Sequence, residues 1–356
     1  MFRKHAAKVV LGAVATGSFA IAFGQEKLQQ MVSLSTSGSP SCLVQFYKET
    51  PPYLMRESLQ KDSYALCFNG FNVMYSGVSK TPLWVAEALT PARLSQKIPR
   101  EDSFHEEDRV SSAHRATLAD YRGSGYDRGH MAPNADMPTK EAQHDSFSLA
   151  NMVPQAPKNN QQVWRELEEA TRAIVTKQKQ EIYVVTGPVY EGKKLAKIGK
   201  GVLVPTATYK AVYIPKLGVT GAYYAPNNNS LKVEIISICA LEDKIGINLF
   251  PNVSEEKKRN TYHLPLTATA VKANKEIAYS HWDAESQCAE QVSSSQLNSL
   301  KKEFKSTNLV TSVLSSSSEQ TEAPSNSAQN GSSDSDTALF KKLLQMLLEF
   351  ILQLLR

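Results

Sequence analysis

One segment, Tyr126-Asp127-Arg128-Gly129-His130-Met131-Ala132-Pro133, constrains the fold of this chain more than any other. We interpret it as a strand that passes into a loop. About thirty residues later, Asn159-Asn160 open a helix that should run from about residue 160 to 179, with Asn159 as a suitable N-cap. The apolar residues of one helix face recur at the required spacing, namely Val163, Leu167, Ala170 and Ile174. The sequence therefore predicts a strand, a loop and a helix that carry the polar residues of this region.

Apolar segments on both sides of this region predict the rest of a sheet. Residues 64–68 and 71–75 flank Asn69-Gly70, a pair that can supply the positive φ angles of a two-residue hairpin turn. Proline should end one strand at Pro154, and Gly187-Pro188 should stop another. The further strands are expected at residues 83–89, 147–154, 181–188, 208–214, 219–224 and 231–239. Strands outnumber helices, so we expect an α+β domain with a central, mainly antiparallel sheet and flanking helices.

Residues 1–24 differ in composition from the remainder of the chain. Basic residues precede an apolar run from Val9 to Phe23 that contains no acidic residue, and small residues lie at the end of the run. This order predicts a signal peptide, so the protein is expected to be exported, either to a periplasm or as a secreted protein. The run is short for a helix that spans a bilayer. An N-terminal membrane anchor and a mitochondrial presequence stay open as alternatives.

Beyond residue 24, the chain divides into an expected lead-in, a domain and a tail. Residues 25–62 have few periodic signals and should form an irregular lead-in to a globular domain at 63–290. Residues 291–337 are expected to be a polar low-complexity linker, because such a composition buries too little surface to fold. Residues 338–356 predict an amphipathic C-terminal helix. That helix should form a homo-oligomer, dock on the domain or lie against a membrane, and the sequence does not decide between these.

Four cysteines lie beyond the N-terminal segment, an even number that suits two disulfides in an exported protein. Of the three pairings that four cysteines allow, we favour Cys42 with Cys67 and Cys239 with Cys288. Each of these pairs closes a moderate loop near one end of the globular region. None of the four has metal-ligand spacing such as Cys-x-x-Cys, so the cysteines give no support for a zinc site.

The residue types around His130 suit the hydrolysis of a phosphodiester. Histidine has an unperturbed pKa near neutrality and can take a proton from water, and the nearby Arg128 can offset negative charge. Hydrated Mg²⁺ polarises a phosphate and needs only one or two protein oxygens, such as the carboxamide of Asn160. The chain has seven histidines, and His130 differs from the others by its neighbours. For Asn160 the alternative role is helix capping, and for Glu168 it is a solvated helix face.

Three segments together resemble the signature of the DNA/RNA non-specific endonucleases. They are residues 127–133 (Asp-Arg-Gly-His-Met-Ala-Pro), 151–155 (Asn-Met-Val-Pro-Gln) and 160–168 (Asn-Gln-Gln-Val-Trp-Arg-Glu-Leu-Glu). Later segments, at 186–190, 204–210 and 246–251, are also similar to that family. The resemblance spans roughly residues 60–290. It implies a ββα-metal nuclease fold, with residues 63–290 as the nuclease domain.

The resemblance implies catalytic roles for residues in the first two segments. His130 matches the general base of the family, and Arg128 matches a residue that stabilises charge on the phosphorane. Asn151 matches an asparagine that orders the site beside the histidine. Asn160 matches the direct Mg²⁺ ligand. We assign Asp127 to holding the loop.

The resemblance also implies roles for residues around the metal and the substrate. Glu168 matches the glutamate that holds the water cluster of the metal. Eight residues of helix rise about 12 Å, so Asn160 and Glu168 should not both bind one ion directly, and water between them reconciles the spacing. Arg172 matches a substrate-binding arginine, although a Glu-Arg pair four residues apart on a helix is also common. Arg100 matches an upstream arginine that contacts phosphate.

The overall charge is mildly basic, with 40 Lys+Arg against 35 Asp+Glu and a net charge of +5. This balance suits a polyanionic partner but does not require one. The basic stretch of Lys193, Lys194, Lys197 and Lys200 has two interpretations, contact with a nucleic-acid backbone or an ordinary solvated loop. The polar residues 95–122 similarly predict either a substrate-facing loop or a plain surface loop.

These inferences predict a Mg²⁺-dependent endonuclease, with Mn²⁺ as a substitute metal. It should cleave DNA and RNA with little sequence preference and leave 5′-phosphate ends, as the resemblance implies. DNA and RNA are thus the expected partners, and the sequence identifies no inhibitor protein. The alternative from another class is a nucleic-acid-binding or uptake module of a larger assembly, which the C-terminal helix motivates. A zinc hydrolase is a third possibility, and the histidine spacing does not support it.

Overall fold

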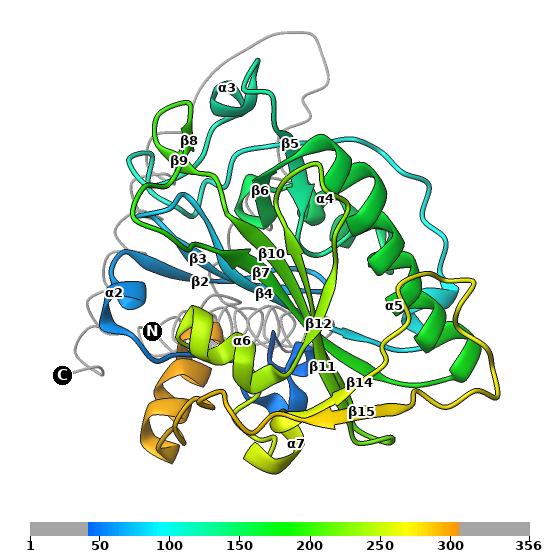
Figure 1. Cartoon of the computed structure of the whole chain (residues 1–356). Helices are drawn as coiled ribbons and strands as arrows, with labels where there is room; N and C mark the ends of the chain where they lie inside the picture. Colours follow the sequence, from blue (N-terminus) through cyan, green and yellow to red (C-terminus); the bar gives the residue numbers. More distant parts are fainter. Residues whose placement is uncertain (1–41, 306–356) are drawn as a thin grey trace, which may run out of the picture. The chain divides into compact units, whose positions relative to one another are not determined.

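The computed structural model describes residues 42–305, which are organised by one seven-stranded sheet (Figure 1). The strand order is β12-β11-β10-β7-β4-β3-β2, and each neighbouring pair is antiparallel. The strands are β2 (Ser63–Cys67), β3 (Asn72–Ser76), β4 (Thr81–Leu89), β7 (Ile182–Val189), β10 (Ala207–Ile214), β11 (Val219–Pro226) and β12 (Glu234–Ile236). This confirms the α+β fold with a central antiparallel sheet. The expected signal peptide and C-terminal helix lie outside the described residues.

Short strand pairs and helices surround this sheet. The pairs are β1 (Tyr53–Leu54) with β13 (Ile247–Asn248), β5 (Asp127–His130) with β6 (Met152–Gln155), β8 (Lys197–Ile198) with β9 (Val202–Leu203), and β14 (Asn260–Tyr262) with β15 (Tyr279–Trp282). The α-helices are α2 (Glu57–Gln60), α3 (Leu118–Tyr121), α4 (Lys140–Ser146), α5 (Arg165–Gln178), α6 (Ile238–Ile245) and α7 (Glu255–Arg259). A π-helical segment, η6 (Asn159–Trp164), leads directly into α5. Short 3-10 turns are η1 (Cys42–Gln45), η2 (Tyr47–Glu49), η3 (Arg93–Ser95), η4 (Asn134–Asp136) and η5 (Leu149–Asn151).

The sheet is covered on both faces, which explains why its central strands β7 and β10 are buried along nearly their whole length. In β7, Ile182 and Val184 belong to one buried cluster, whereas Val185 and Val189 belong to another. The first cluster includes the apolar face of α5, and the second includes α6. Side chains of a strand alternate between the faces, so a strand with two buried faces needs no polar positions.

The β5–β6 ribbon and α5 lie on the same face of the sheet (Figure 1). Met131 and Val153 from the ribbon and Trp164 and Leu167 from the helix are buried together in the first cluster. This packing fixes the ribbon against the helix. It is the arrangement that positions the polar residues named in the sequence.

The hairpin of β2 and β3 forms where expected, but its turn differs. Gly70 has a positive φ of 115°, whereas Asn69 is not among the described residues with positive φ. The reason is a tertiary contact. The backbone N–H and the side-chain Nδ2 of Asn69 both donate to Asp145 Oδ2 at 2.9 Å, which holds this residue outside a two-residue turn of the expected type.

Two strands continue through residues that were expected to end them. Pro154 lies inside β6, opposite Arg128, because a two-stranded ribbon consists of edge strands that tolerate a missing N–H. Strand β7 runs through Gly187-Pro188 to Val189 and pairs with β10 there. A Cβ at position 187 would lie 2.6 Å from the Tyr209 hydroxyl, so glycine here makes room for a buried tyrosine.

The boundaries of the expected domain also differ from the structure. Within the expected lead-in, residues 42–62 include η1, η2, β1 and α2, and Phe46 is buried in the second cluster. At the other end, residues 294–305 are helical, and Leu300 and Phe304 are buried in that same cluster. The strand expected at 231–239 is limited to β12, because Ser237 caps the start of α6 by accepting from Ala240 N.

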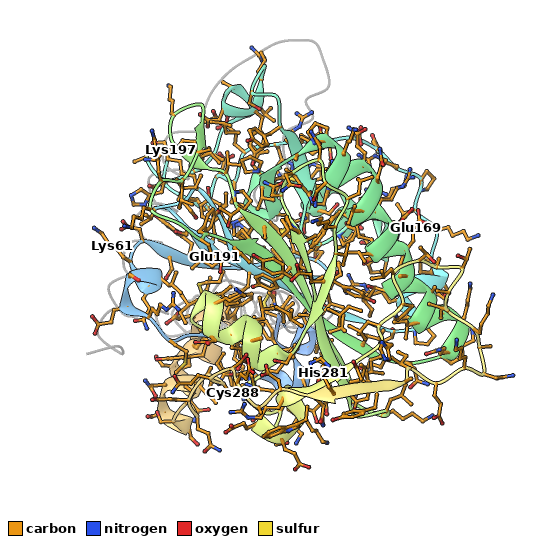
Figure 2. All side chains as sticks on the ribbon, in the orientation of Figure 1. Lys61, Glu169, Glu191, Lys197, His281 and Cys288 are labelled. Atoms are coloured by element: carbon orange, nitrogen blue, oxygen red, sulfur yellow. A yellow bond between two sulfur atoms is a disulfide. The ribbon has the colours of Figure 1, made fainter. Side chains whose placement is uncertain are left out.

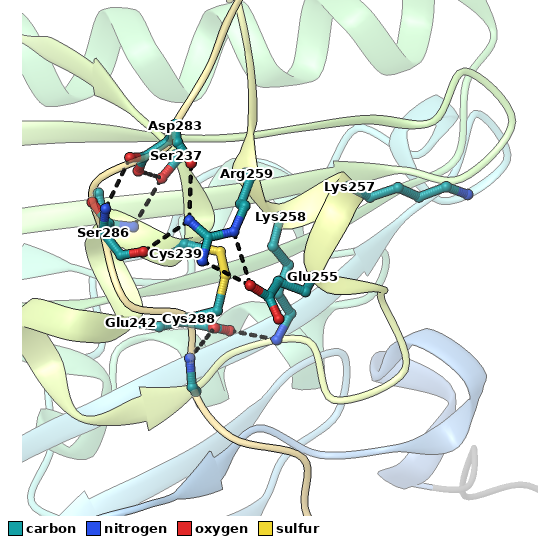
Figure 3. Close-up of a disulfide and its surroundings, with 12 residues drawn as sticks. Ser237, Cys239, Glu242, Glu255, Lys257, Lys258, Arg259, Asp283, Ser286 and Cys288 are labelled. Atoms are coloured by element: carbon teal, nitrogen blue, oxygen red, sulfur yellow. Dashed lines mark hydrogen bonds and ion pairs between the residues drawn. A yellow bond between two sulfur atoms is a disulfide. The ribbon is translucent and has the colours of Figure 1, made fainter.

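Two disulfides join the cysteines as the sequence favours, Cys42 with Cys67 and Cys239 with Cys288. The second lies among hydrogen bonds that tie the segment after β15 to α6 and α7 (Figure 3). Within residues 42–305, no helix is long and apolar enough to cross a membrane.

Candidate active site

Five of the seven residues predicted for the site line one pocket of about 720 Å³. They are Arg100, Arg128, His130, Asn160 and Glu168. They come from the loop before α3, from β5, from η6 and from α5. The strand and the helix are packed together in the core beneath them, so the pocket has a rigid floor. Asn151 and Arg172 are not among the residues that line this pocket.

His130 ends β5 and is held by its backbone and by its ring faces. Trp164 Nε1 donates to the carbonyl oxygen of His130 at 3.1 Å. The imidazole contacts the rings of Phe104 and Phe147, at centroid distances of 5.7 and 5.0 Å. Its Nε2 atom is buried and has no hydrogen-bond partner within the described residues. The ring is therefore positioned by packing, and one nitrogen is left free.

The surroundings of His130 keep its imidazole neutral. Burial, and after it the positive charges of Arg100 and Arg128, lower the pKa of His130 to about 3. At neutral pH the ring therefore carries no charge, and one of its nitrogens offers a lone pair.

Asn151 acts on the backbone that follows His130. Its Oδ1 atom accepts from Ala132 N at 2.9 Å, and its Nδ2 atom donates to Ala132 O at 2.8 Å and Ser146 O at 2.9 Å. The side chain is fully buried. Asn151 thus fixes the loop after the histidine and does not line the pocket. The catalytic role that the resemblance implies for it stays a prediction.

Asn160 is oriented by Asp127. Its Nδ2 atom donates to Asp127 Oδ2 at 2.9 Å, and Gln161 Nε2 donates to the same oxygen at 2.8 Å. Within residues 42–305, no donor contacts the carboxamide oxygen of Asn160. That oxygen is therefore free to bind a cation or water, because the nitrogen is the atom held by the protein.

The helix begins differently from the prediction, and Asn159 is not its N-cap. Residues 157 and 158 are already helical, and Asn159 and Asn160 lie in the π-helical segment. The Asn159 side chain is 1% exposed; it accepts from Gln155 Nε2 and donates to Pro226 O. Capping was the expected role because asparagine commonly caps helices, but here tertiary partners use both ends of the amide. The two adjacent asparagines thus have different surroundings.

Glu168 lines the pocket from α5, and the charges of Lys210, Arg172 and Asp136 act on its carboxyl group. Burial raises the pKa of Glu168 to about 7, although the positive charges of Lys210 and Arg172 oppose this shift. Lys210 is 1% exposed and donates from Nζ to Thr186 Oγ1 at 3.1 Å. The protein alone therefore compensates the Glu168 carboxylate poorly, which is the condition under which a carboxylate attracts a cation.

Arg172 makes a structural ion pair. Its Nη1 atom donates to Asp136 Oδ1 at 2.9 Å, and the two side chains are 20% and 3% exposed. Asp136 O also accepts from Arg93 Nε at 2.7 Å, which connects this pair to the core. The substrate-binding role that the resemblance implies for Arg172 stays a prediction.

Two of the arginines that line the pocket, Arg100 and Arg128, are positioned by aromatic rings. The Arg128 guanidinium lies 4.0 Å from the centroid of Phe104, and that of Arg100 lies 5.3 Å from the centroid of Phe147. Arg100 also pairs with Asp102, with Nε and Oδ1 2.6 Å apart, and both side chains are more than half exposed. These cations can reach a phosphate at the pocket mouth, and the rings beneath them reduce their freedom.

The pocket also includes residues that the sequence did not single out. Arg122, Tyr126, Gln161 and Arg165 line it. Tyr126 and Arg165 lie within or beside the quoted motifs, and Arg122 ends the polar segment expected to face a substrate. Their positions in or near the motifs indicated that they could belong to the site. The sequence did not show which of the many polar side chains in these segments line the pocket.

The donors fit a hard, hydrated cation better than a zinc ion. Among residues 42–305, no group of three His, Cys, Asp or Glu side chains could hold a metal. The pocket instead offers the free Asn160 oxygen and the Glu168 carboxylate. Mg²⁺ commonly keeps several waters and binds few protein oxygens, so this set suits it.

A family model and individual known proteins place this chain in the same family. The family model for DNA/RNA non-specific endonuclease matches residues 53–256. Human mitochondrial endonuclease G is 37% identical over 213 residues, which cover 54% of this chain and 69% of that protein. A nuclease of Nostoc sp. is 34% identical over 253 residues, which cover 66% of this chain and 90% of that protein.

A solved structure has the same fold. A chain in a crystal structure of the EndoG/EndoGI complex aligns with a TM-score of 0.52 and 25% sequence identity. The alignment covers 62% of this chain and 96% of the other. The region shared with these proteins contains the pocket and the ribbon that leads into it.

Proposed function

The chain belongs to the DNA/RNA non-specific endonuclease family and is a nuclease, and from this premise we propose that it is a Mg²⁺-dependent endonuclease that hydrolyses both DNA and RNA. The observation that carries this proposal is the pocket shared by His130, Asn160 and Glu168, with a buried ring nitrogen of His130 left without a partner. A water-activating base and a cation site on one wall are what phosphodiester hydrolysis needs.

In the proposed mechanism, His130 is the general base. Its free ring nitrogen takes a proton from a water molecule as the water oxygen attacks phosphorus. The bond from phosphorus to the 3′-oxygen breaks, so the products carry a 5′-phosphate and a 3′-hydroxyl. At neutral pH the imidazole is unprotonated, and the negative charge of a bound phosphate would offset the arginine charges that lower its pKa.

The other residues position and neutralise charge. Arg128 and Arg100 would stabilise the negative charge that develops on the phosphoryl oxygens. Asp127 holds the nitrogen of the Asn160 carboxamide, so the Asn160 oxygen would bind the cation and Glu168 would hold the water around it. Bound Mg²⁺ would supply positive charge and a coordinated water that protonates the leaving oxygen. Asn151 keeps the loop after His130 in register.

Cleavage of plasmid DNA and of RNA in the presence of Mg²⁺ tests the proposal. His130→Ala should lower the rate by about 10²–10⁴-fold, because that is the usual contribution of a general base. Asn160→Ala should lose both cleavage activity and high affinity for the metal ion. His263, an exposed histidine outside the pocket, provides the control, and His263→Ala should cleave like the wild type. Equal activity in all of these proteins would reject the assigned site, and no activity in any would reject the enzyme.

Metal exchange tests the cofactor. Chelation should abolish cleavage, Mg²⁺ should restore it, and Mn²⁺ should substitute. Zn²⁺ should not, because among residues 42–305 no group of three His, Cys, Asp or Glu side chains could hold it. Rescue by Zn²⁺ alone would revive the zinc hydrolase.

We also propose that the protein is exported. The two disulfides support an oxidising compartment, because such bonds are rare in reducing ones. Its relatives are found in different settings, since human endonuclease G is mitochondrial and the Nostoc nuclease is bacterial. Fractionation of cells, with the protein detected by antibody, distinguishes export from a mitochondrial location or an N-terminal membrane anchor.

A further inference from the structure

The basic stretch at residues 193–200, here called the basic arm, carries unneutralised charge. Its four lysines are exposed, and none has an ion pair within the described part of the chain. The acidic residue just before the arm, Glu191, is occupied by Lys244 at 3.2 Å and by the Tyr224 hydroxyl at 3.0 Å. The lysines are Lys193, Lys194, Lys197 and Lys200. The sequence analysis singled out these lysines, and the proposed mechanism gives them no role.

The arm is fastened to α3. The backbone N–H of Lys200 donates to Asp120 Oδ1, and the other oxygen of Asp120 accepts from Thr117 N and Thr117 Oγ1 at 2.7 and 2.8 Å. Gly199 has a positive φ of 48°, and a Cβ there would lie 2.5 Å from the Cβ of Asp120. Both oxygens of the Asp120 carboxylate thus accept hydrogen bonds that hold the turn, and Asp120 forms no ion pair with the lysine side chains of the arm.

A separate hydrophobic cluster joins the arm to the wall of the pocket. Its buried members from the arm side are Ile198, Val202 and Val204, and those from the pocket side include Tyr121 and Met152. Several side chains of this cluster also line the pocket, namely Phe104, Leu118, Tyr121 and Tyr126. Figure 1 shows β8 and β9 beside α3, next to the end of the molecule that holds β5, and Figure 2 shows Lys197 at the outer edge of this hairpin. The arm therefore has a fixed position beside the pocket.

Arginines continue the positive charge from the arm into the pocket. Arg122 follows α3 directly, is exposed and lines the pocket, and within residues 42–305 it has no ion pair. Arg128 and His130 line the same pocket. Two α3 residues, Asp120 and Tyr121, thus contact the arm and the pocket respectively.

From this arrangement we infer that the basic arm is a second binding site for the substrate, which holds backbone phosphates beyond the one that is cleaved. The inference rests on the proposed function and adds a site to it. Lysines suit this task because they act as mobile point charges, and they read no bases. A site of this kind strengthens binding to long chains of any sequence and makes that binding dependent on salt.

Binding measurements with the full chain test the arm separately from cleavage. The probe is a labelled duplex of about 30 base pairs in EDTA, which prevents cleavage, and the readout is the slope of log affinity against log salt concentration. Changing all four arm lysines to Gln should make this slope shallower by about 3–4, since each neutralised phosphate contributes about 0.9. The matched control changes four exposed lysines on other surfaces, Lys257, Lys272, Lys275 and Lys302, to Gln. The control should keep the wild-type slope.

Cleavage measurements separate the arm from the catalytic pocket. The arm variant should hydrolyse a small phosphodiester, bis(p-nitrophenyl) phosphate, with Mg²⁺ at the wild-type rate, but should lose at least about tenfold in kcat/KM on the long duplex. An unchanged slope in the arm variant, an equal loss in the control variant, or no duplex binding by the wild type would overturn the inference. If the wild type binds the duplex but hydrolyses neither substrate, the proposed function fails while the arm is still tested by its slope.

Discussion

At the scale of single residues, the pocket depends on groups whose protonation is set by their surroundings. Burial and two arginines lower the pKa of His130 to about 3, whereas burial raises the pKa of Glu168 to about 7. His130 is thereby kept neutral, whereas Glu168 is partly protonated near neutral pH, and its carboxylate form would gain from a nearby cation. Titratable groups shifted in opposite directions within one cleft are typical of catalytic sites.

Asp127 is expected to act through Asn160. Asp127→Ala removes the acceptor that holds Asn160 Nδ2, so the carboxamide can rotate and present the wrong atom to the metal. We expect the apparent affinity for Mg²⁺ to fall by about 10–100-fold, with much of the rate recovered at saturating Mg²⁺. Titration of activity with Mg²⁺ measures this. Gln161→Ala removes only the neighbouring bond to Asp127 and should have a smaller effect; an equal effect would contradict the assignment.

Glu168 should make the metal-free protein less stable at high pH. Its pKa is about 7 in the folded state against 4.5 normally, so the folded state binds more protons between these values, and stability falls as pH rises through this window. In EDTA at about pH 8, Glu168→Gln should therefore be more stable than the wild type by about 1–3 kcal/mol, and the gain should vanish below pH 4.5. Thermal unfolding at several pH values measures this.

The control for this experiment is the neighbouring glutamate. Glu169 lies on the outer face of α5, where its side chain is 49% exposed (Figure 2). Glu169→Gln should not give the gain at high pH. A Glu168→Gln protein that is less stable than the wild type at about pH 8 would show that the carboxylate is well compensated.

At the scale of elements, the π-helical segment decides which asparagine faces the pocket. Asn159 is held between Gln155 and Pro226, inside the protein, and the next residue then faces Asp127 and the pocket. Gly129 in β5 leaves room for Gln155, the partner of Asn159. A Cβ at position 129 would lie 2.7 Å from Gln155 Cβ. Short π-helical segments frequently occur at functional sites, since the extra residue redirects the side chains that come after it.

Adjacent alanine substitutions should separate stability from activity. Asn159→Ala leaves buried partners on Gln155 and Pro226 without a bond, so it should lower the free energy of unfolding by about 1–3 kcal/mol. Asn160→Ala removes a partly exposed group and should leave stability within about 0.5 kcal/mol while abolishing activity. Urea unfolding and plasmid cleavage measure the two effects. Equal losses of stability in both variants would contradict the division of roles.

At the scale of the whole described molecule, the two ends of the described residues are held on the sheet face opposite the pocket. Phe46 and Phe304 both contact Trp84, at ring distances of 5.8 and 5.7 Å, and also contact each other at 5.3 Å. Cys288 lies beyond the region matched by the family model, and its disulfide ties this later segment to α6 (Figure 3). The contacts that hold these two ends and the later segment therefore lie on the other face of the sheet from the pocket.

Loss of a disulfide should weaken the fold without changing the chemistry. Replacing Cys239 and Cys288 with Ser frees a loop of 49 residues and should cost about 4 kcal/mol, on a chain-entropy estimate. The rate of cleavage at low temperature should stay the same, because neither cysteine lines the pocket. Guanidinium unfolding and cleavage assays at about 10 °C measure both quantities. A rate that falls with stability intact would show that the disulfide shapes the site.

Among the three possible cysteine pairings, the sequence favoured the one that the structure shows. By itself the sequence determined the class of fold and the identity of the residues around His130. These depend on local patterns, namely alternating burial, a helical apolar face and a motif of contiguous residues, which neighbours in the chain set on their own. It did not determine that Asn159 is structural while Asn160 faces the pocket, that Asp127 orients the Asn160 amide, or that residues 294–305 fold onto the sheet. Only the tertiary structure decided these, because each depends on a partner far away in the chain, such as Pro226 for Asn159 or Phe46 for Phe304. At these positions the role of a side chain depends on which distant group it hydrogen-bonds or packs against. That contact forms only after folding of the sheet has brought the two residues together.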